Sequence, residues 1–357
     1  MIKKECFTTK WIEQVASELH YNDKNLIEKV IRALSLLEML VKAGCPLVFK
    51  GGTALMLILG ESAHRLSIDI DVICPPGTNI EDYLKSYADF GFINLELVER
   101  KQRDDANIPK SHSKFFYQIA YRNDTDAQSY ILLDVLYEDI HYFQTQQISI
   151  DCPFIRLDGE PLMVTVPSTE DILGDKLTAL APNTTGIPYY KNGRSCSMEI
   201  AKQLYDVGRL FENISGLQIT GKAFRKIAVV ELSYRSLGTD IGHVFNDIRQ
   251  TALCISTRGK SGEGDFNLIQ DGIIRVKSFM YRQRYLIDNA IIDAARAAYL
   301  STLIEKEVTE VERYSNNPAD ISDLVIRPSL TNKLNKLKSN LPEAFYYWAK
   351  TSELLET

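Results

Sequence analysis

The chain has 357 residues, 45% hydrophobic and 25% charged, which is ordinary for a globular protein of two or three domains. A formal net charge of −6 does not by itself indicate a nucleic-acid binder, and six scattered cysteines without a CxxC pair argue against a disulfide framework or a zinc site. No apolar run reaches membrane-spanning length and no signal peptide is recognisable, so we expect a cytoplasmic protein without a membrane partner.

The first part of the chain mixes helical and strand patterns. Apolar spacing predicts helices at 9–20, 24–43, 53–59 and 80–88. Apolar runs and alternating patterns predict strands at 45–49, 66–73, 93–99, 114–122, 129–138 and 145–150. We therefore expect residues 1–166 to form an α+β domain with a mixed or antiparallel sheet and flanking helices.

The character of the sequence changes at Pro167. Ser168 followed by Asp171 is a capping signal for a helix that runs to about Leu180. A loop rich in Pro and Gly follows at 181–195, and helical patterns dominate from there to the end. We expect residues 167–357 to form a mainly helical C-terminal domain.

The segment LSIDIDVI, at 66–73, carries two aspartates two positions apart. In a strand, Ser67, Asp69 and Asp71 would share one face, opposite the apolar side chains. Two carboxylates that close repel each other unless a cation neutralises them, and Mg²⁺ is bound by one or two carboxylates together with water and phosphate oxygens. The alternative is an edge strand with a solvated face and incidental aspartates.

Upstream of these aspartates, Gly51 and Gly52 follow a predicted strand and open a predicted helix. Backbone N–H groups at such a turn can approach a phosphate closely, and Thr53 could add a hydroxyl donor. The turn is not a Walker P-loop, because no GKS or GKT follows it. A glycine turn, a helix and then a strand with two carboxylates form a more specific order than either motif alone.

KGGTAL with RLSIDID resembles the signature of the DNA polymerase beta-type nucleotidyltransferase superfamily, and more narrowly the AbiEii/MenT nucleotidyltransferase toxins of bacterial toxin–antitoxin and phage-defence systems. GDKLTAL, with Lys176, resembles that family's lysine motif. AKQLYDVGRLF, with Asp206, resembles its DLYDL-type motif, although Lys202 and Gln203 stand where the family often has a basic residue and Asp. The resemblance covers roughly residues 25–212.

The resemblance implies a nucleotidyltransferase-like sheet and a metal-dependent transfer of a nucleoside monophosphate (NMP) from a nucleoside triphosphate (NTP). Asp69 and Asp71, with Asp134 in ILLDVLYE as the third carboxylate, would hold Mg²⁺ or Mn²⁺ in a two-metal displacement. Asp134 lies in an apolar row of its strand between Leu132 and Leu136, where an isolated aspartate is unfavourable. Its alternative role is to pair with a structural Arg or Lys.

Other residues are assigned by the same resemblance. Lys176 would contact nucleotide phosphates and Asp206 would orient it or the acceptor, against the alternatives of a surface lysine and a helix-surface carboxylate. From its place on the carboxylate face, Ser67 could bind the triphosphate. Arg65 or His64 could bind the nucleotide and stabilise its leaving group, unless they are only loop charges.

The acceptor that the resemblance implies is RNA, with the tRNA 3′ end expected, and a cognate antitoxin is implied as partner. The segment RVKSFMYRQRY, at 275–285, interleaves cations with aromatic rings, as a single-stranded 3′ end would need, unless its rings belong to the core. Two alternatives stay open: a nucleotidyltransferase that modifies a protein or a small molecule, and a nucleotide-binding regulatory protein without productive transfer.

Overall fold

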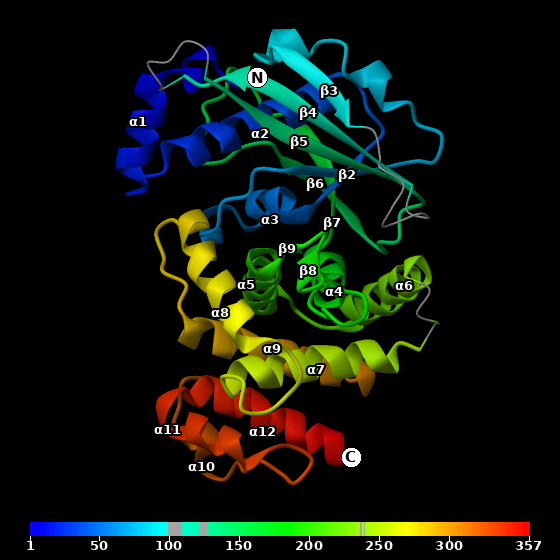
Figure 1. Ribbon diagram of the computed structural model, residues 1–357, viewed down its shortest axis with the longest axis vertical. Coiled ribbons are helices and arrows are strands. Elements are labelled where there is room, and N and C mark those ends of the chain that lie inside the picture. The colour runs from blue at the N-terminus through cyan, green and yellow to red at the C-terminus, as the bar shows by residue number, and fades with distance from the viewer. Residues whose placement is uncertain (99–108, 121–126, 236–237, 239) are drawn as a thin grey trace. The chain divides into compact units, whose positions relative to one another are not determined.

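The computed structural model describes residues 1–98, 109–120, 127–235, 238 and 240–357. The chain divides into two compact units, one formed by residues 1–168 with 278–284, the other by 169–277 with 285–357. Figure 1 labels many of the helices and strands of both. None of the helices in these ranges is both long and apolar enough to cross a membrane.

The first unit contains a five-stranded sheet of order β1-β2-β5-β4-β3, in which β2 and β5 are parallel and the other pairs antiparallel. Its strands are β1 (Val48–Lys50), β2 (Ile70–Cys74), β3 (Asn94–Val98), β4 (Lys110–Gln118) and β5 (Gln128–Tyr137). A separate antiparallel pair joins β6 (Thr145–Ser149) to β7 (Met163–Pro167). The mixed sheet confirms the predicted fold class; β7 was not predicted, and the predicted strand ends at Glu99 and 121–122 lie outside the described residues.

The described part of this unit includes the α-helices α1 (Thr9–Glu18), α2 (Lys24–Lys42) and α3 (Gly51–Leu59). Asp23 caps α2, its side chain accepting from the Leu26 N–H at 3.1 Å, and Gly44 follows the helix end with a φ of +74°. The predicted helix at 80–88 is wrong, because two short 3-10 helices, η3 (Ile80–Tyr83) and η4 (Tyr87–Phe90), stand there. Asp, Ser and Tyr, which favour α-helices weakly, make up much of this segment.

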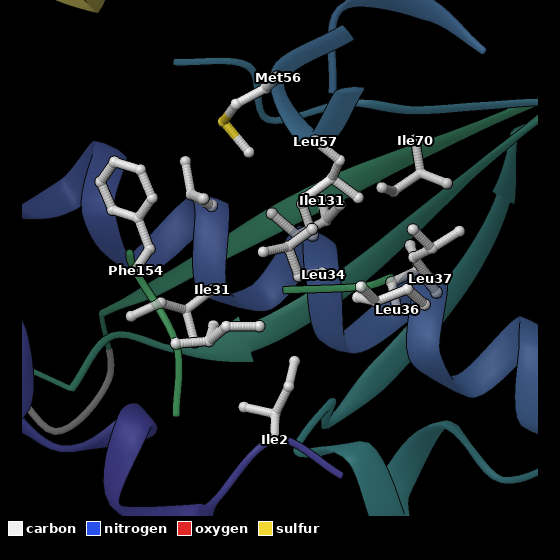
Figure 2. Close-up of a cluster of buried hydrophobic side chains, with 14 of the residues drawn as sticks. Ile2, Ile31, Leu34, Leu36, Leu37, Met56, Leu57, Ile70, Ile131 and Phe154 are labelled. Carbon is white, nitrogen blue, oxygen red and sulfur yellow. The ribbon is translucent and has the colours of Figure 1, made fainter. Parts of the chain in front are cut away.

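One face of the sheet forms the core of the first unit. Figure 2 shows Ile31 and Leu34 of α2 in one cluster of buried side chains with Ile131 of β5 and Ile70 of β2. Along β5 the buried side chains alternate with half-buried ones, and Asp134 belongs to the half-buried set. Packing α2 on one face therefore leaves the opposite face, which carries Asp134, for polar side chains.

The second unit is helical. Its longer helices are α4 (Thr169–Ala179), α5 (Ser197–Asn213), α6 (Gln218–Tyr234), α7 (Gly242–Ser256), α8 (Phe266–Val276), α9 (Ile287–Glu305) and α12 (Pro342–Glu356). Shorter pieces are α10 (Ala319–Ser322), η6 (Asn332–Lys336) and α11 (Leu337–Asn340). α9 packs against α5, α7 and α12, so it forms the centre of this unit.

The loop at 181–195 ends in a small hairpin, β8 (Tyr190–Lys191) paired with β9 (Arg194–Ser195). Asn192 and Gly193 connect the strands with φ of +52° and +72°, the combination that a two-residue type I′ turn requires.

Tyr281 and Tyr285 are only 3% and 2% exposed, so these two rings of the 275–285 segment are core residues and not stacking surfaces.

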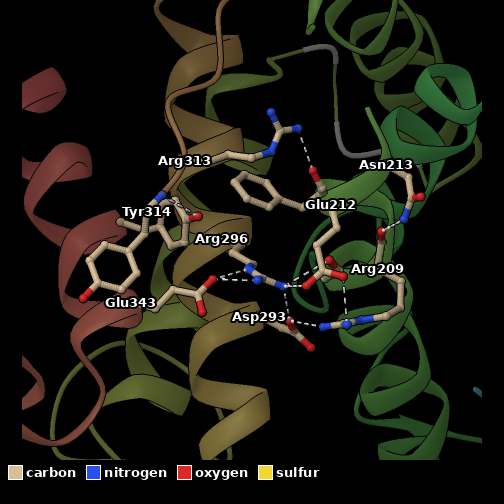
Figure 3. Close-up of polar contacts among 11 residues, drawn as sticks. Arg209, Glu212, Asn213, Asp293, Arg296, Arg313, Tyr314 and Glu343 are labelled. Atoms are coloured by element: carbon tan, nitrogen blue, oxygen red, sulfur yellow. Dashed lines mark hydrogen bonds and ion pairs between the residues drawn. The ribbon is translucent and has the colours of Figure 1, made fainter. Parts of the chain in front are cut away.

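A buried charge network joins α5, α9 and α12 in the second unit (Figure 3). Asp293 Oδ1 lies 3.2 Å from Arg296 Nη1 and 3.5 Å from Arg209 Nη2, and Arg296 Nη2 lies 2.6 Å from Glu343 Oε1. A Cβ at Gly208 would lie 2.0 Å from Asp293 Oδ1, so only glycine fits there. Burial raises the pKa of Asp293 to about 6, although the charges of Arg209 and Arg296 lower it.

This pKa makes stability depend on pH. An unfolded aspartate has a pKa of about 3.9, so the folded chain binds the Asp293 proton more tightly and its stability falls as pH rises from about 4 through 6. Between pH 5 and pH 7 the wild type is expected to lose about 1 kcal/mol more free energy of unfolding than Asp293→Asn. Urea denaturation of both proteins at these pH values measures the difference; parallel pH profiles would refute it.

Candidate active site

Four polar residues form a row across four neighbouring strands of the first unit. Lys50 of β1 is the register partner of Asp71 on β2, Asp71 is the partner of Asp134 on β5, and Asp134 is the partner of His112 on β4. Register partners on adjacent strands lie about 5 Å apart and project from the same face. The two predicted carboxylates are therefore neighbours, with a basic side chain on each side.

Asp134 has a direct partner within this row. His112 Nδ1 lies 2.5 Å from Asp134 Oδ1, and the side chains are 33% and 38% exposed. Of the alternatives for Asp134, the structure thus shows a histidine partner and not a structural Arg or Lys. The second oxygen of this half-exposed carboxylate remains on the polar face of the sheet.

The glycine turn lies directly against Asp71. Gly51 has a φ of +80°, and a Cβ built on it would lie 2.1 Å from Asp71 Oδ2. α3 begins at this residue, and no side chain caps its N-terminus. The first N–H groups of a helix lack partners within the helix and favour negative charge, so this turn can receive a phosphate oxygen next to the carboxylate.

Ser67 and Arg65 face the same turn. A Cβ on Gly52 would lie 2.6 Å from Ser67 Oγ and 2.9 Å from Arg65 Nη2. Arg65 is 6% exposed, and its Nη1 donates to the Leu66 carbonyl at 3.0 Å. A guanidinium and a hydroxyl thus lie at the start of α3, as expected for groups that bind a triphosphate.

Thr53 has a structural bond in this arrangement. The residue is buried, and its hydroxyl donates to the Asp69 carbonyl oxygen at 2.7 Å. This bond ties the first turn of α3 to the segment that enters β2. Thr53 therefore positions the aspartate segment rather than offering a free hydroxyl to a phosphate.

The predicted strand at 66–73 is shorter than expected, because β2 begins only at Ile70. The backbone before it pairs instead with residues 278–284: the Leu66 N–H donates to the Phe279 carbonyl at 2.8 Å, and the Tyr281 N–H donates to the His64 carbonyl at 2.9 Å. The prediction that Ser67, Asp69 and Asp71 share one strand face is therefore wrong, because Ser67 and Asp69 precede β2. A segment more than 200 positions later in the chain holds this loop.

The donor set of the carboxylates bears on whether they can hold a metal. Within the described ranges, no three or more His, Cys, Asp or Glu side chains are grouped so that they could hold a metal ion by themselves. Asp71 and Asp134 supply two neighbouring carboxylates, the number that Mg²⁺ takes when phosphate and water complete its shell. The pair therefore fits a cation that is shared with a bound nucleotide.

Lys176 and Asp206 belong to the second unit, where they bind each other. Lys176 Nζ on α4 lies 2.9 Å from Asp206 Oδ2 on α5, and the side chains are 9% and 1% exposed. The surface-lysine and surface-carboxylate alternatives are therefore wrong. A Cβ at Gly174 would lie 2.8 Å from backbone atoms of α6, so this glycine lets α4 and α6 approach closely.

Removing one charge of this buried pair should destabilise the protein. Asp206→Asn leaves the Lys176 ammonium buried opposite a neutral amide, and the expected loss is about 2 kcal/mol in the free energy of unfolding. Lys176→Met/Asp206→Asn removes both charges and should recover most of that loss. Lys222→Met, at an exposed lysine of α6, is the control. Denaturant unfolding measures the free energy of unfolding of each variant. A double variant less stable than Asp206→Asn would contradict the pairing.

Sequence reasoning missed Lys50 and His112. Lys50 directly precedes the glycine turn, a position that could have suggested it. His112 stands on an alternating strand pattern, but only the register of β4 with β5 shows that it meets Asp134.

Comparison with known proteins places the chain in a family. The model for the nucleotidyl transferase AbiEii toxin, of a type IV toxin–antitoxin system, matches residues 34–311. The chain belongs to the AbiEii family. This confirms the resemblance stated from KGGTAL and RLSIDID, and with it nucleotidyl transfer as the family's activity.

Two solved structures to which the chain is similar are distant from it in sequence. JHP933 from Helicobacter pylori is 15% identical with a TM-score of 0.39, covering 83% of this chain and 94% of its own. The nucleotidyltransferase toxin MenT4 from Mycobacterium tuberculosis H37Rv is 14% identical with a TM-score of 0.42, covering 82% of this chain and 89% of its own. No curated protein matches the chain.

Proposed function

We propose that this AbiEii-family protein transfers an NMP from an NTP to an RNA acceptor, the 3′ end of tRNA, by a two-metal in-line displacement at the α-phosphorus. The observation that carries the proposal is the placement of Asp71 and Asp134 in register on neighbouring parallel strands, with the Gly51 turn against Asp71. This arrangement offers carboxylates for cations and helix N–H groups for phosphate at one place.

The cations in this proposal are Mg²⁺ or Mn²⁺. Asp71 and Asp134 would hold them, and Asp69, one residue before β2, would supply the third carboxylate. When bound, such ions neutralise phosphate charge and stabilise the attacking and leaving oxygens. His112 keeps one oxygen of Asp134 occupied and so fixes which oxygen faces the ligand.

The triphosphate is proposed to bind along the start of α3. Its oxygens would accept from the N–H groups of Gly51 and Gly52, from the Ser67 hydroxyl and from the Arg65 guanidinium, whose atoms crowd the Gly52 position. Because Arg65 is buried and already bonded to the Leu66 carbonyl, it is held in place before the nucleotide arrives.

Lys176 is proposed to contact nucleotide phosphates as a point charge, with Asp206 holding its ammonium in place. The 2.9 Å ion pair supports this role, since it fixes the ammonium at a buried position. A cognate antitoxin is the proposed protein partner, by membership in the AbiEii family. Reduced cysteines and a cytoplasmic location remain part of the proposal.

Acceptor labelling tests this proposal. Each NTP, labelled at the α-phosphate, is incubated with Mg²⁺ and either total tRNA, a protein extract or a small-molecule fraction. We expect label on tRNA alone, and we expect ribonuclease to remove it. Label on protein or on small molecules would keep the chemistry and reject the RNA acceptor; bound but untransferred NTP in every mixture would reject the transferase proposal.

A further inference from the structure

The second unit contains a cavity of about 450 Å³ between the turn after α7 and the segment formed by η6 and α11. Its volume lies in the range of sites for small ligands. Five charged residues line it: Arg258, Lys260, Asp288, Lys333 and Lys336. With four cations and one anion, the cavity carries a formal charge of +3, in a chain whose total is −6.

The walls of this cavity are fixed by hydrogen bonds. The Thr257 hydroxyl donates to the Leu253 carbonyl at 2.8 Å and accepts from the Ser261 N–H at 3.0 Å, which orders the turn after α7. Lys333 Nζ bridges from the opposite wall, donating to the Lys260 carbonyl and to Ser261 Oγ, the latter at 3.0 Å. The cavity is therefore preformed rather than a gap between mobile side chains.

Its cations are not neutralised equally. Arg258 Nη2 lies 3.0 Å from Asp288 Oδ1, whereas the exposed ammonium groups of Lys260 and Lys336 form no ion pair or side-chain hydrogen bond with the described part of the chain. Lys333 Nζ already donates to the Lys260 carbonyl and to Ser261 Oγ on the opposite wall. Two uncompensated ammonium groups beside a third in one cavity repel each other, and an anion between them would remove that repulsion.

Helix α12 adds to the positive potential. Asn340 and Leu341 of the cavity lining lead directly into this 15-residue helix. No side chain caps its N-terminus, and Pro342 at the first position has no N–H. The positive end of the helix macrodipole thus lies at the cavity, where it favours an anion.

The lining also indicates which part of an anionic ligand is bound. None of the described residues that line the cavity is aromatic, so it offers no ring on which a base could stack. Ile291, Leu337 and Leu341 are its apolar side chains, and they carry no side-chain donors that could read a base edge. Lysines and a helix N-terminus bind phosphate groups without regard to sequence.

We propose that this cavity binds backbone phosphates of the RNA acceptor, as a sequence-independent site in the helical unit. The inference rests on the proposed function for the identity of the acceptor. Lys333 and Lys336 lie beyond residue 311, outside the part of the chain that the AbiEii family matches. Arg258, Lys260 and Asp288 lie inside the matched part, so the cavity combines residues from both parts of the chain.

The test is RNA binding without nucleotide. Affinity for total tRNA is measured over a range of salt concentrations for the wild type, for Lys260→Gln/Lys336→Gln, and for the control Lys222→Gln/Lys226→Gln. The control removes two exposed lysines of α6. Each lost phosphate contact lowers the slope of log affinity against log salt by about 0.7–0.9, so the cavity pair should lower it by about 1.5 and weaken binding about tenfold at low salt. NTP binding, measured on the same proteins, should not change.

Three outcomes would overturn the proposal. The first is an unchanged slope of log affinity against log salt for the cavity pair, and the second is an equal fall of that slope in the control pair. The third is a loss of NTP binding with RNA binding intact, which would make the cavity a site for free nucleotide. NMP transfer by the wild type is measured in parallel. If the wild type transfers label to tRNA and the cavity pair keeps its slope, only this inference fails. If the wild type transfers nothing, the proposed function fails.

Discussion

Asp71→Asn is expected to reduce nucleotidyl transfer by about 10³-fold or more while the protein stays folded. The substitution keeps the shape of the side chain but removes one of two carboxylates that stand in register on β2 and β5. A loss of 10³ corresponds to about 4 kcal/mol of transition-state stabilisation. Single-turnover transfer with saturating Mg²⁺ measures the effect.

The same variant gives a second readout in metal-free buffer. Because neighbouring carboxylates repel each other without a cation, Asp71→Asn should melt at the same temperature as the wild type or a few degrees higher in EDTA. Asp139→Asn, at an exposed aspartate just after β5, is the matched control and should change neither quantity. A melting temperature several degrees lower, or transfer within tenfold of wild type, would argue for a structural aspartate.

Gly51→Ala is expected to reduce transfer at least about 100-fold. Its φ of +80° strains any other residue, and the new Cβ would lie 2.1 Å from Asp71 Oδ2, so the carboxylate must leave its position. Displacement by even 1 Å at a reacting site can cost about 10²-fold in rate. Transfer per folded molecule is measured at a temperature where both proteins are folded.

Gly44→Ala separates strain from steric displacement. Gly44 has a similar φ of +74°, but a Cβ added there would meet nothing within 4 Å. Both variants should therefore lose about 1–2 kcal/mol of stability from the left-handed backbone, and only Gly51→Ala should lose transfer. Equal transfer by the two variants would show that the approach of Asp71 to the glycine turn has no catalytic consequence.

Local patterns predicted the parts of this site that are close in sequence. The KGGTAL turn and the aspartates of LSIDID lie within 22 positions. Alternation placed Asp134 on one strand face with Leu132 and Leu136, but it did not show that this face is the half-buried one. Such patterns report periodicity and backbone freedom, which act over a few residues.

The remaining features depend on contacts between distant segments. His112 meets Asp134 only because β4 and β5 pair in one register, and a shift of one residue would turn His112 to the other face. Residues 66–69 read as strand by alternation, yet their backbone is held by the segment at 278–284. The pairing of Lys176 with Asp206 likewise requires α4 and α5 to be packed together, which no local pattern states.

The most direct test of the central claim compares two positions of the label in one NTP. The protein is incubated with total tRNA and Mg²⁺, with the label at either the α- or the γ-phosphate, beside Asp71→Asn and an EDTA control. The account predicts α-label on the RNA, γ-label released as pyrophosphate, and neither with Asp71→Asn or EDTA. Appearance of γ-label on the acceptor, or full transfer by Asp71→Asn, would contradict it.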